Sequence, residues 1–441
     1  MKTAAALLIT ILAAQLSARA ADVQAMVRAR VDAEYPSLLD LYQHLHRHPE
    51  ISFQEANTAA RIADELKQAG FTVTTNVGGH GVVGVLKNGT GPTVLVRTDL
   101  DGLPVLEETG LSYASQARTK DDQGKDVPAM HACGHDVHMT SLIGTARVLA
   151  ALRDRWNGTL VFIGQPAEER VGGAKRMLAE GLFTRFPRPD FCLALHVASD
   201  LPAGTVGQTE GYALANADTV DILVRGVSGH GAWPHMTKDP IVLAAQIVLA
   251  LQTIVSRETS PTDPAVVTVG SIHGGTKHNI IPDEVRLQLT LRSYSDEVRE
   301  ASIAAVKRIA RGQALAAGIP EKLLPVVTVS DEGARSTYND PALTKRVAAA
   351  IGRWIGPANV VTKGPVMGAE DFGLFGRTQP KIPICIFWLG TITKESVLES
   401  IKLGKTLPSL HSSKFAPVPE PTLKTGVAAM SAAVLELVGK P

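Results

Sequence analysis

Short apolar runs rich in β-branched residues alternate with helical patterns through most of this chain, and that alternation limits the fold more than any other feature. Strands that alternate with helices in this way form parallel sheets with helices on both faces. We therefore expect an α/β domain with a mostly parallel sheet. The expected strands are residues 82–86, 93–96, 159–164, 191–196 and 382–389, with helices at 58–70, 139–152 and 173–180.

The order of the expected elements changes near residue 215. A strand, a helix, two strands, a helix and a last strand follow one another between residues 219 and 330. This order is the split βαβ signature of a ferredoxin-like α+β domain. We predict that such a domain occupies residues 214–331 and is inserted into a catalytic domain made of residues 21–213 and 332–441.

The first twenty residues have the pattern of an export signal. Met1-Lys2 supplies a positive start, residues 4–16 are apolar, and Ala18-Arg19-Ala20 fits a small-x-small cleavage site. The apolar run is shorter than the ~20 residues that span a bilayer. We predict a signal peptide at 1–20, and a secreted or periplasmic protein that has no membrane contact after cleavage.

Charge and cysteine content narrow the classes of partner and of covalent link. A formal net charge of +1 gives no reason to expect a nucleic acid as partner. The three cysteines, Cys133, Cys192 and Cys385, cannot all pair with one another. Cys192 and Cys385 lie in apolar strand-like runs, which favours buried thiols, while a disulfide between them stays open.

Residues 130–139 carry the densest chemistry in the chain. They read Met-His-Ala-Cys-Gly-His-Asp-Val-His-Met, and half of these side chains bind metals or move protons. Imidazole and thiolate are ligands that suit zinc and its first-row neighbours. Cys133 and His135 stand two residues apart, so both can face one ion on an extended segment or a tight turn. This segment predicts half of a metal site.

The other half is expected where polar residues follow the predicted strands. Asp99 and Asp101 follow one strand, Glu168 and Glu169 another, and His196 a third. In open α/β sheets, functional groups gather beyond the carboxyl ends of the strands. Two adjacent carboxylates repel one another unless a cation lies beside them. One Glu can then bind a divalent metal while its neighbour acts as general base on water.

Eight motifs in one order carry a family resemblance. They are RTDLDGLP, MHACGHDVH, GQPAEE, LALHV, SGHGAWPH, GGTKHNIIPD, GAEDF and LHS. Together they are similar to the M20 metallopeptidase family and most resemble its aminoacylase-type branch. That branch includes hippurate hydrolases, N-acyl-amino-acid amidohydrolases and plant auxin-conjugate hydrolases. The match covers nearly all of the chain that follows the predicted signal peptide.

The resemblance implies a binuclear metal centre and a set of catalytic roles. Glu168 matches the general base, and Asp101 matches the family's orienting carboxylate. Asp99 stands where other members of the family place a metal-binding histidine. The implied ligands of two divalent ions (Zn²⁺ or Mn²⁺, with Co²⁺ or Ni²⁺ as alternatives) are Cys133, His135, Glu169, His196 and His411.

Further roles follow from the same resemblance for the inserted lid domain. His230 matches a histidine that reaches the partner's active site in dimeric relatives and steadies the oxyanion. Asn279 and Arg292 match residues that contact the substrate carboxylate, and Glu370 matches a glutamate that supports the site. The resemblance therefore implies a homodimer that forms through the lid. Trp233, close to His230, suggests an aromatic or extended apolar acyl group in the substrate.

The expected function is hydrolysis of the amide bond of N-acyl amino acids, hippurate-like or aromatic-acyl, by a metal-activated water. Three alternatives remain open from the sequence. A thiol hydrolase would use Cys133 as nucleophile and His135 as base. A periplasmic metal-binding or ligand-binding protein would keep the two-domain cleft without catalysis. A dipeptidase of the same family would differ only in substrate.

Overall fold

The structure is a computed structural model that describes the backbone of residues 2–440 and the side chains of residues 22–440. The predicted signal peptide, residues 1–20, lies outside the residues that are described in full. The chain divides into two compact units. The first unit comprises Met1–Gly211, Tyr338–Gly364 and Phe372–Pro441, and the second comprises Tyr212–Thr337 and Pro365–Asp371. The segment that contains Glu370 therefore belongs to the second unit, whereas the sequence predicted it in the domain of residues 21–213 and 332–441.

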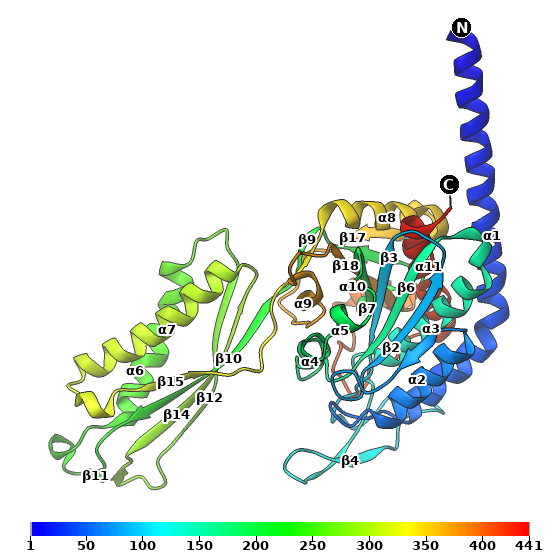
Figure 1. Ribbon diagram of the computed structural model, residues 1–441. Coiled ribbons are helices and arrows are strands. Elements are labelled where there is room, and N and C mark those ends of the chain that lie inside the picture. The colour runs from blue at the N-terminus through cyan, green and yellow to red at the C-terminus, as the bar shows by residue number, and fades with distance from the viewer. Residues whose placement is uncertain (1, 441) are drawn as a thin grey trace. The chain divides into compact units, whose positions relative to one another are not determined.

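An eight-stranded sheet forms the centre of the first unit (Figure 1), in the order β1-β2-β6-β3-β7-β18-β8-β17. The central neighbours β6, β3, β7 and β18 run parallel, and antiparallel pairs join β1, β2 and β8 to that core. The predicted α/β class with a mostly parallel sheet is thus confirmed. The strands are β1 (Thr72–Thr74), β2 (Val82–Asn88), β3 (Thr93–Asp99), β6 (Gly158–Gln165), β7 (Phe191–Pro202), β8 (Val206–Gln208), β17 (Val360–Thr362) and β18 (Ile384–Ile392).

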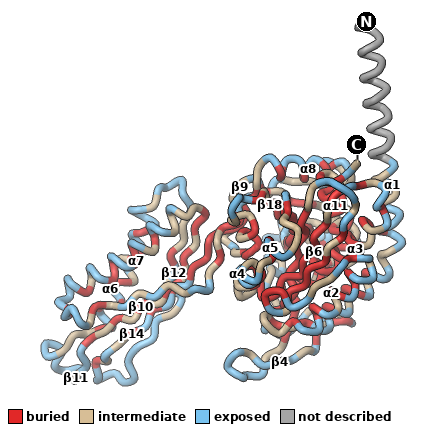
Figure 2. The backbone as a smooth tube through the Cα atoms, viewed as in Figure 1, coloured by how far each residue is buried: buried red, intermediate tan, exposed pale blue. Residues whose placement is uncertain are grey.

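Helices cover both faces of this sheet, so β3, β6 and β18 are buried along nearly their whole length (Figure 2). Alternate residues such as Val94, Val96 and Phe162 pack in one cluster with α1, α3 and α11, while α4 and α9 contact the sheet outside that cluster. Burial on both faces explains the continuous apolar runs in the sequence. The helices are α1 (Lys2–Arg47), α2 (Ala56–Gln68), α3 (His135–Ala151), α4 (Gly173–Ala179), α5 (Leu182–Arg185), α8 (Pro341–Ile355), α9 (Gly373–Gly376), α10 (Lys394–Leu403) and α11 (Pro419–Val438).

The second unit has the connectivity that the sequence predicts for a ferredoxin-like domain. Its antiparallel sheet has the order β12-β14-β10-β15, and helices α6 and α7 pack against it. A separate short ribbon pairs β11 (Gly229–His230) with β13 (Ile280–Ile281). The main elements are β10 (Asn216–Arg225), α6 (Pro240–Thr253), β12 (Ala265–Gly274), β14 (Glu284–Ser293), α7 (Asp296–Ala316) and β15 (Val326–Val329).

Among the described residues, one helical stretch is long and apolar enough to cross a membrane, and it is Pro240–Glu258 in the second unit. Its inner face is core, because Leu243, Ile247 and Leu251 are buried against the sheet. The apolar length of this stretch is therefore accounted for in part by packing within the domain.

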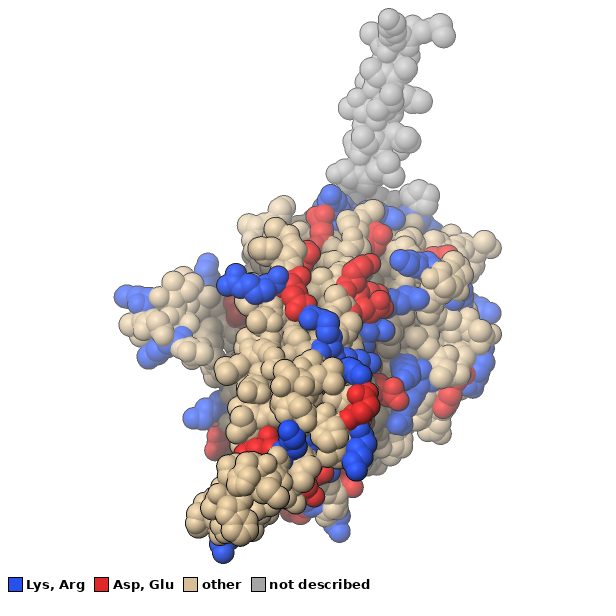
Figure 3. Space-filling model, turned by 90° about the vertical axis from the view of Figure 1, so that its left-hand side faces the viewer, with Lys and Arg blue, Asp and Glu red and all other residues tan. Residues whose placement is uncertain are grey.

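On the molecular face drawn in Figure 3, basic and acidic side chains are interspersed.

Cys192 and Cys385 lie on neighbouring strands but do not pair. Cys192 stands opposite Ile384, and Cys385 stands opposite Leu193, so the two side chains point to opposite faces of the sheet. Both thiols are free and buried. Burial raises the pKa of Cys192 well above its usual value and that of Cys385 to about 12. Of the two alternatives that the sequence left open, the structure shows buried thiols and no disulfide between Cys192 and Cys385.

A buried charge network ties α1 to the first turn of α3. His46 contacts Asp136 through Nδ1 at 2.7 Å and Glu107 through Nε2 at 3.0 Å, so both ring nitrogens donate and the ring is a cation. Burial alone would lower the pKa of His46, but the hydrogen bonds and charges of Asp136 and Glu107 outweigh it and raise the pKa to about 9. Asp136 directly follows His135, so this network anchors a segment of the predicted metal site.

We predict that the His46 cation stabilises the fold in a pH-dependent way. Its folded pKa lies above the unfolded value of about 6.5, so the stabilisation is complete below that pH and is lost as pH rises through about 9. The measurement is the unfolding temperature of chelator-treated wild type and His46→Gln from pH 6 to pH 10. The stability advantage of wild type should shrink as pH rises. An advantage that stays constant or grows with pH would contradict the assignment.

Candidate metal centre

The parallel register brings the polar strand ends of the first unit to one level. Asp99, the last residue of β3, pairs with Gln165, the last residue of β6. On the other side Arg97 pairs with Ala194, so His196 lies level with Asp99 two residues further along. The turn after β6 carries Glu168 and Glu169. Three neighbouring strands thus deliver acidic groups and a histidine to the same edge of the sheet.

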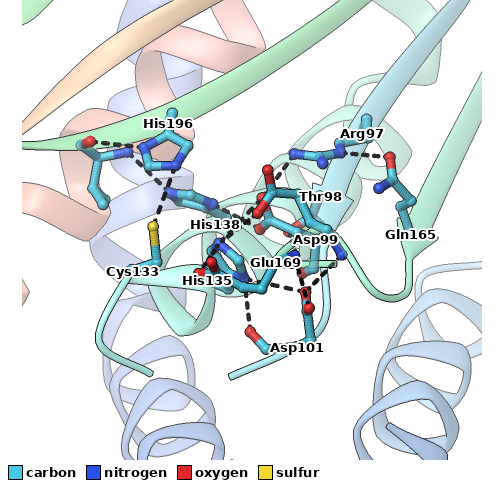
Figure 4. A network of polar contacts seen from close by, with 12 residues as sticks. Arg97, Thr98, Asp99, Asp101, Cys133, His135, His138, Gln165, Glu169 and His196 are labelled. Carbon is cyan, nitrogen blue, oxygen red and sulfur yellow. Dashed lines mark hydrogen bonds and ion pairs between the residues drawn. The ribbon is translucent and has the colours of Figure 1, made fainter. Parts of the chain in front are cut away.

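The candidate ligands gather at this edge in overlapping trios. Cys133, His135 and His196 form one trio, and Cys133, Glu169 and His411 form another. Within each trio the ligand atoms lie within 4.8 Å of one another. All five implied metal ligands therefore come together in the first unit, with Cys133 common to both trios. Figure 4 shows four of them, with Cys133 and His196 on one side of His135.

A left-handed glycine shapes the Cys133–His135 segment. Gly134 has φ of +75° and stands directly before α3, which begins at His135. A Cβ at Gly134 would lie 2.6 Å from Cγ2 of Val197, on the strand that carries His196. Only glycine combines that backbone angle with that approach. The helix therefore starts at His135, four residues earlier than the sequence predicts. The tight turn at Gly134 points the side chains of Cys133 and His135 toward one centre.

Hydrogen bonds orient the histidine ligands. His135 Nδ1 donates to the carbonyl oxygen of Asp101 at 2.7 Å, and His196 Nδ1 donates to that of Val197 at 2.8 Å. In the neutral ring each Nε2 is then the unprotonated nitrogen, which is the form that binds a metal. Nε2 of His196 lies 3.6 Å from Sγ of Cys133, and Nε2 of His135 is buried with no hydrogen-bond partner among the described residues.

Asp99 and His138 have structural roles in this arrangement. The Asp99 carboxylate accepts from Arg97 at 2.7 Å and from His138 Nδ1 at 2.7 Å. His138 Nε2 accepts the backbone N–H of Val197 at 2.9 Å, so both of its nitrogens are occupied. His138 therefore links β3 to β7 beside His196. By residue type the sequence makes His138 a possible metal ligand, and only the fold shows that its role differs from that of the ligands.

Asp101 holds the turn that carries the two glutamates. Its carboxylate accepts the backbone N–H of Glu168 at 3.1 Å and that of Glu169 at 3.0 Å. It also accepts a hydrogen bond from the hydroxyl of Ser52 at 2.6 Å, while the backbone carbonyl of Asp101 accepts one from Nδ1–H of His135. The sequence reasoning missed Ser52, because a lone serine after Ile51 carries no motif of its own.

The electrostatics of the centre fit a cation. Burial raises the pKa of the Cys133 thiol far above its usual range, and the charges of Glu169, Glu168 and Asp99 raise it further. Burial also raises the pKa of Glu169 to about 7. Burial would lower the pKa of His135, yet Asp99 and Asp101 outweigh it and raise that pKa to about 10. Divalent ions would replace these protons and favour the thiolate, carboxylate and neutral imidazole forms.

Two buried atoms without hydrogen-bond partners also indicate a bound cation. His135 Nε2 and Glu169 Oε1 have no hydrogen-bond partner in the described chain, although both are hidden from solvent. Buried polar atoms without partners are costly and are rare in native proteins. Both atoms belong to the implied ligand set, and they lie 3.8 Å apart. The donor set of one thiolate, three imidazoles and one carboxylate suits zinc and its first-row neighbours. The residues present therefore fit a metal centre.

The remaining predicted site residues lie in the second unit. His230, on β11, is exposed, and the N–H of Gly231 donates to the carbonyl of Asn279 at 2.9 Å, so His230 and Asn279 are neighbours. Arg292 is near the far end of β14, opposite Ala217 and Val266. Arg292 follows the start of β14 by eight residues, roughly 26 Å at the rise of an extended strand. The structure therefore brings His230 and Asn279 together but keeps Arg292 apart from them.

Glu370 is buried, and it belongs to the second unit. Its carbonyl oxygen accepts a hydrogen bond from the Thr337 hydroxyl at 3.3 Å, and the neighbouring Gly368 accepts the N–H of Ala215. These contacts fasten the 365–371 segment to the strands of its own unit. The supporting role that the resemblance implies for Glu370 stays a prediction, as do the roles of His230, Asn279 and Arg292.

Comparisons with known proteins agree with this geometry. The family described as Peptidase family M20/M25/M40 matches residues 95–436. Thermostable carboxypeptidase 1 of Saccharolobus solfataricus is 35% identical over 396 residues, which cover 89% of this chain and 93% of that protein. N-acetylcysteine deacetylase of Bacillus subtilis is 35% identical over 364 residues, with 81% and 89% covered.

A solved structure is similar over nearly the whole length. The Bacillus subtilis YXEP protein, described as a dinuclear metal binding peptidase from the M20 family, superposes with a TM-score of 0.73 at 30% identity. The match covers 92% of this chain and 99% of that one. These similarities set aside the thiol-hydrolase and non-catalytic alternatives. The chain belongs to the M20/M25/M40 peptidase family and is a metal-dependent amidohydrolase.

Proposed function

We propose that this protein is an exported hydrolase of N-acyl amino acids, with two divalent ions bound by Cys133, His135, Glu169, His196 and His411. The observation that carries the proposal is the gathering of these five side chains beside a sixth group, Glu168, at one sheet edge. Zn²⁺ is the first choice of metal because thiolate and imidazole dominate the donor set, with Mn²⁺ as the second.

The chain supplies a base next to its ligands. Glu168 is buried, and one of its carboxylate oxygens lies 3.8 Å from Nε2 of His135. Bound divalent ions would lower the pKa of water at this place and polarise the substrate carbonyl. Glu168 accepts the proton of that water and returns it to the leaving nitrogen. His230 donates to the oxyanion, the role that the family resemblance implies for it.

The substrate class follows from the relatives and from one lid residue. A carboxypeptidase and an N-acetylcysteine deacetylase both cleave, by their names, an amide bond of an amino-acid derivative. Trp233 is 60% exposed, and its ring centroid lies 5.1 Å from that of His230. A large exposed ring beside a group that contacts the oxyanion would favour aromatic or extended apolar acyl groups. We therefore place N-benzoyl and other aromatic-acyl amino acids first.

Chelation and loss of Glu168 should each abolish turnover. Amino-acid release from N-acetyl, N-benzoyl and aromatic-acyl substrates should stop with chelator and return with Zn²⁺ or Mn²⁺. Glu168→Gln should lower kcat by about 10²- to 10⁴-fold, because the proton acceptor is gone, while metal content stays at the wild-type level. Full activity in Glu168→Gln would refute the mechanism.

Trp233→Ala should lower kcat/KM for aromatic-acyl substrates more than for N-acetyl ones. An unchanged substrate ranking in Trp233→Ala would refute the acyl assignment.

The lid geometry supports a homodimer. If His230 and Asn279 contact the substrate and Arg292 does so too, one chain cannot supply all three to one small molecule. His230 and Asn279 lie at the β11–β13 ribbon, which precedes the start of β14, whereas Arg292 is near the far end of β14. Two chains can supply them, one through its ribbon and the other through Arg292. The outer face of α6 presents Val242 (54% exposed) and Leu249 (73%), seven residues apart on one side, and β12 is an edge strand. We place a second copy of the chain on this surface.

A charged residue in that apolar surface should split the dimer. Leu249→Glu is expected to be monomeric by light scattering and to lose most of its kcat/KM, with its helical content unchanged. Leu398→Glu on α10, at an exposed leucine of the first unit (57% exposed), is the matched control and should stay dimeric. A wild-type protein that is monomeric and fully active would contradict the assembly.

Export is part of the proposal because of the leader pattern in residues 1–20. We expect the protein recovered from outside the cytoplasm to begin at Ala21, since signal peptidases cleave after small-x-small sites. Intact-mass measurement of that protein reads the N-terminus directly. Recovery of the full-length chain from the cytoplasm alone would contradict export.

A further inference from the structure

Glu55, the residue directly before α2, makes contacts that the mechanism above does not use. Its side chain is fully buried, at 0% exposure. Oε1 accepts two backbone N–H groups, from Phe53 at 2.9 Å and from Ala167 at 2.7 Å. Oε2 has no hydrogen-bond partner among the described residues. A buried carboxylate is costly to keep, so its contacts indicate what it does there.

The contact with Ala167 falls on a strained turn beside the reacting groups. Ala167 directly precedes Glu168 and has φ of +48°, in the left-handed region that residues with a Cβ rarely adopt. Its carbonyl accepts the N–H of Gly172 at 3.1 Å, which closes the turn. Such a conformation persists only where its surroundings hold it, and it sets the direction in which the next residues point.

Two buried carboxylates together bind three consecutive N–H groups of this turn. Glu55 takes the N–H of Ala167, and Asp101 takes those of Glu168 and Glu169. Ser52, three residues before Glu55, donates to the same Asp101 carboxylate. The short segment before α2 therefore reaches the turn by two routes. Burial raises the pKa of Glu55 to about 7, and the negative charge of Asp101 adds to the shift.

We propose that Glu55 is a positioning residue of the hydrolytic site: it holds the left-handed turn at Ala167 that aims Glu168 at the reacting water and Glu169 at the metal. The proposal rests on the proposed roles of those two glutamates. Glu55 is 112 positions away from Ala167 and belongs to no ligand motif. It acts only through the backbone, so it does not touch substrate or metal.

The test compares Glu55→Ala, Glu55→Gln and the control Glu50→Ala. Glutamine keeps an oxygen acceptor for both N–H groups, whereas alanine removes it. Glu50 is matched because its carboxylate accepts N–H groups of Asn57 and Thr58 at the same end of α2. For Glu55→Ala we expect kcat to fall, with KM unchanged, and the Zn²⁺ affinity of the apo-protein in chelator competition to weaken, each by about 10- to 100-fold. In Glu55→Gln and Glu50→Ala, kcat and the Zn²⁺ affinity should stay within about threefold of wild type. Glu55→Gln keeps the acceptor, and Glu50→Ala leaves the turn intact.

Several outcomes would overturn the positioning role. Glu55→Ala with wild-type kcat and wild-type Zn²⁺ affinity is one. Equal losses in Glu55→Ala and Glu50→Ala, which would indicate only a disturbed α2, are another. If Glu55→Ala does not fold, Glu55→Asp replaces it, since the shorter carboxylate loses Ala167 but keeps the charge, and the same two losses are expected. A wild-type protein without turnover would refute the proposed function, while the Zn²⁺ measurement would still decide the role of Glu55.

Discussion

The hydrogen bonds of the buried residue Asp101 are the interactions on which the rest of the site depends. Its carboxylate accepts hydrogen bonds from the N–H groups of Glu168 and Glu169 and from the hydroxyl of Ser52, and the backbone carbonyl of Asp101 accepts one from Nδ1–H of His135. One residue, two positions beyond the end of β3, thus places the base and two ligands and sets the tautomer of one of them. Removing it would leave several buried polar groups unpaired, which costs more than the contacts themselves contribute.

The fold supplies that residue and its neighbours at one level. Parallel pairing of β6, β3 and β7 aligns three strand ends, and the left-handed Gly134 turns α3 so that its first residue, His135, faces them. His138, one turn further along α3, bridges Asp99 to the backbone of Val197 beside His196. Much of the metal centre is therefore built on strand ends and a helix start, which hold side chains more precisely than loops do.

Much of this was predictable because apolar periodicity marks strands and because the polar residues that follow strands meet at one edge. The α/β class, the ferredoxin-like order and the candidate ligands came from such local patterns and from the family resemblance. The supporting residues could not be found in this way. Ser52, Glu55 and His46 act through contacts with segments far away in the chain, and a lone Ser, Glu or His carries no spacing to read. The distance between Arg292 and His230 likewise depends on strand register.

The most direct test of the account is a crystal structure of the purified protein with Zn²⁺, with anomalous scattering measured at the zinc edge. The account predicts two anomalous peaks, both within about 2.0–2.3 Å of ligand atoms drawn from Cys133, His135, Glu169, His196 and His411. His138 should remain hydrogen-bonded to Asp99 and bind neither ion. Peaks bound elsewhere, or a His138 nitrogen in place of one of the five ligands, would contradict it.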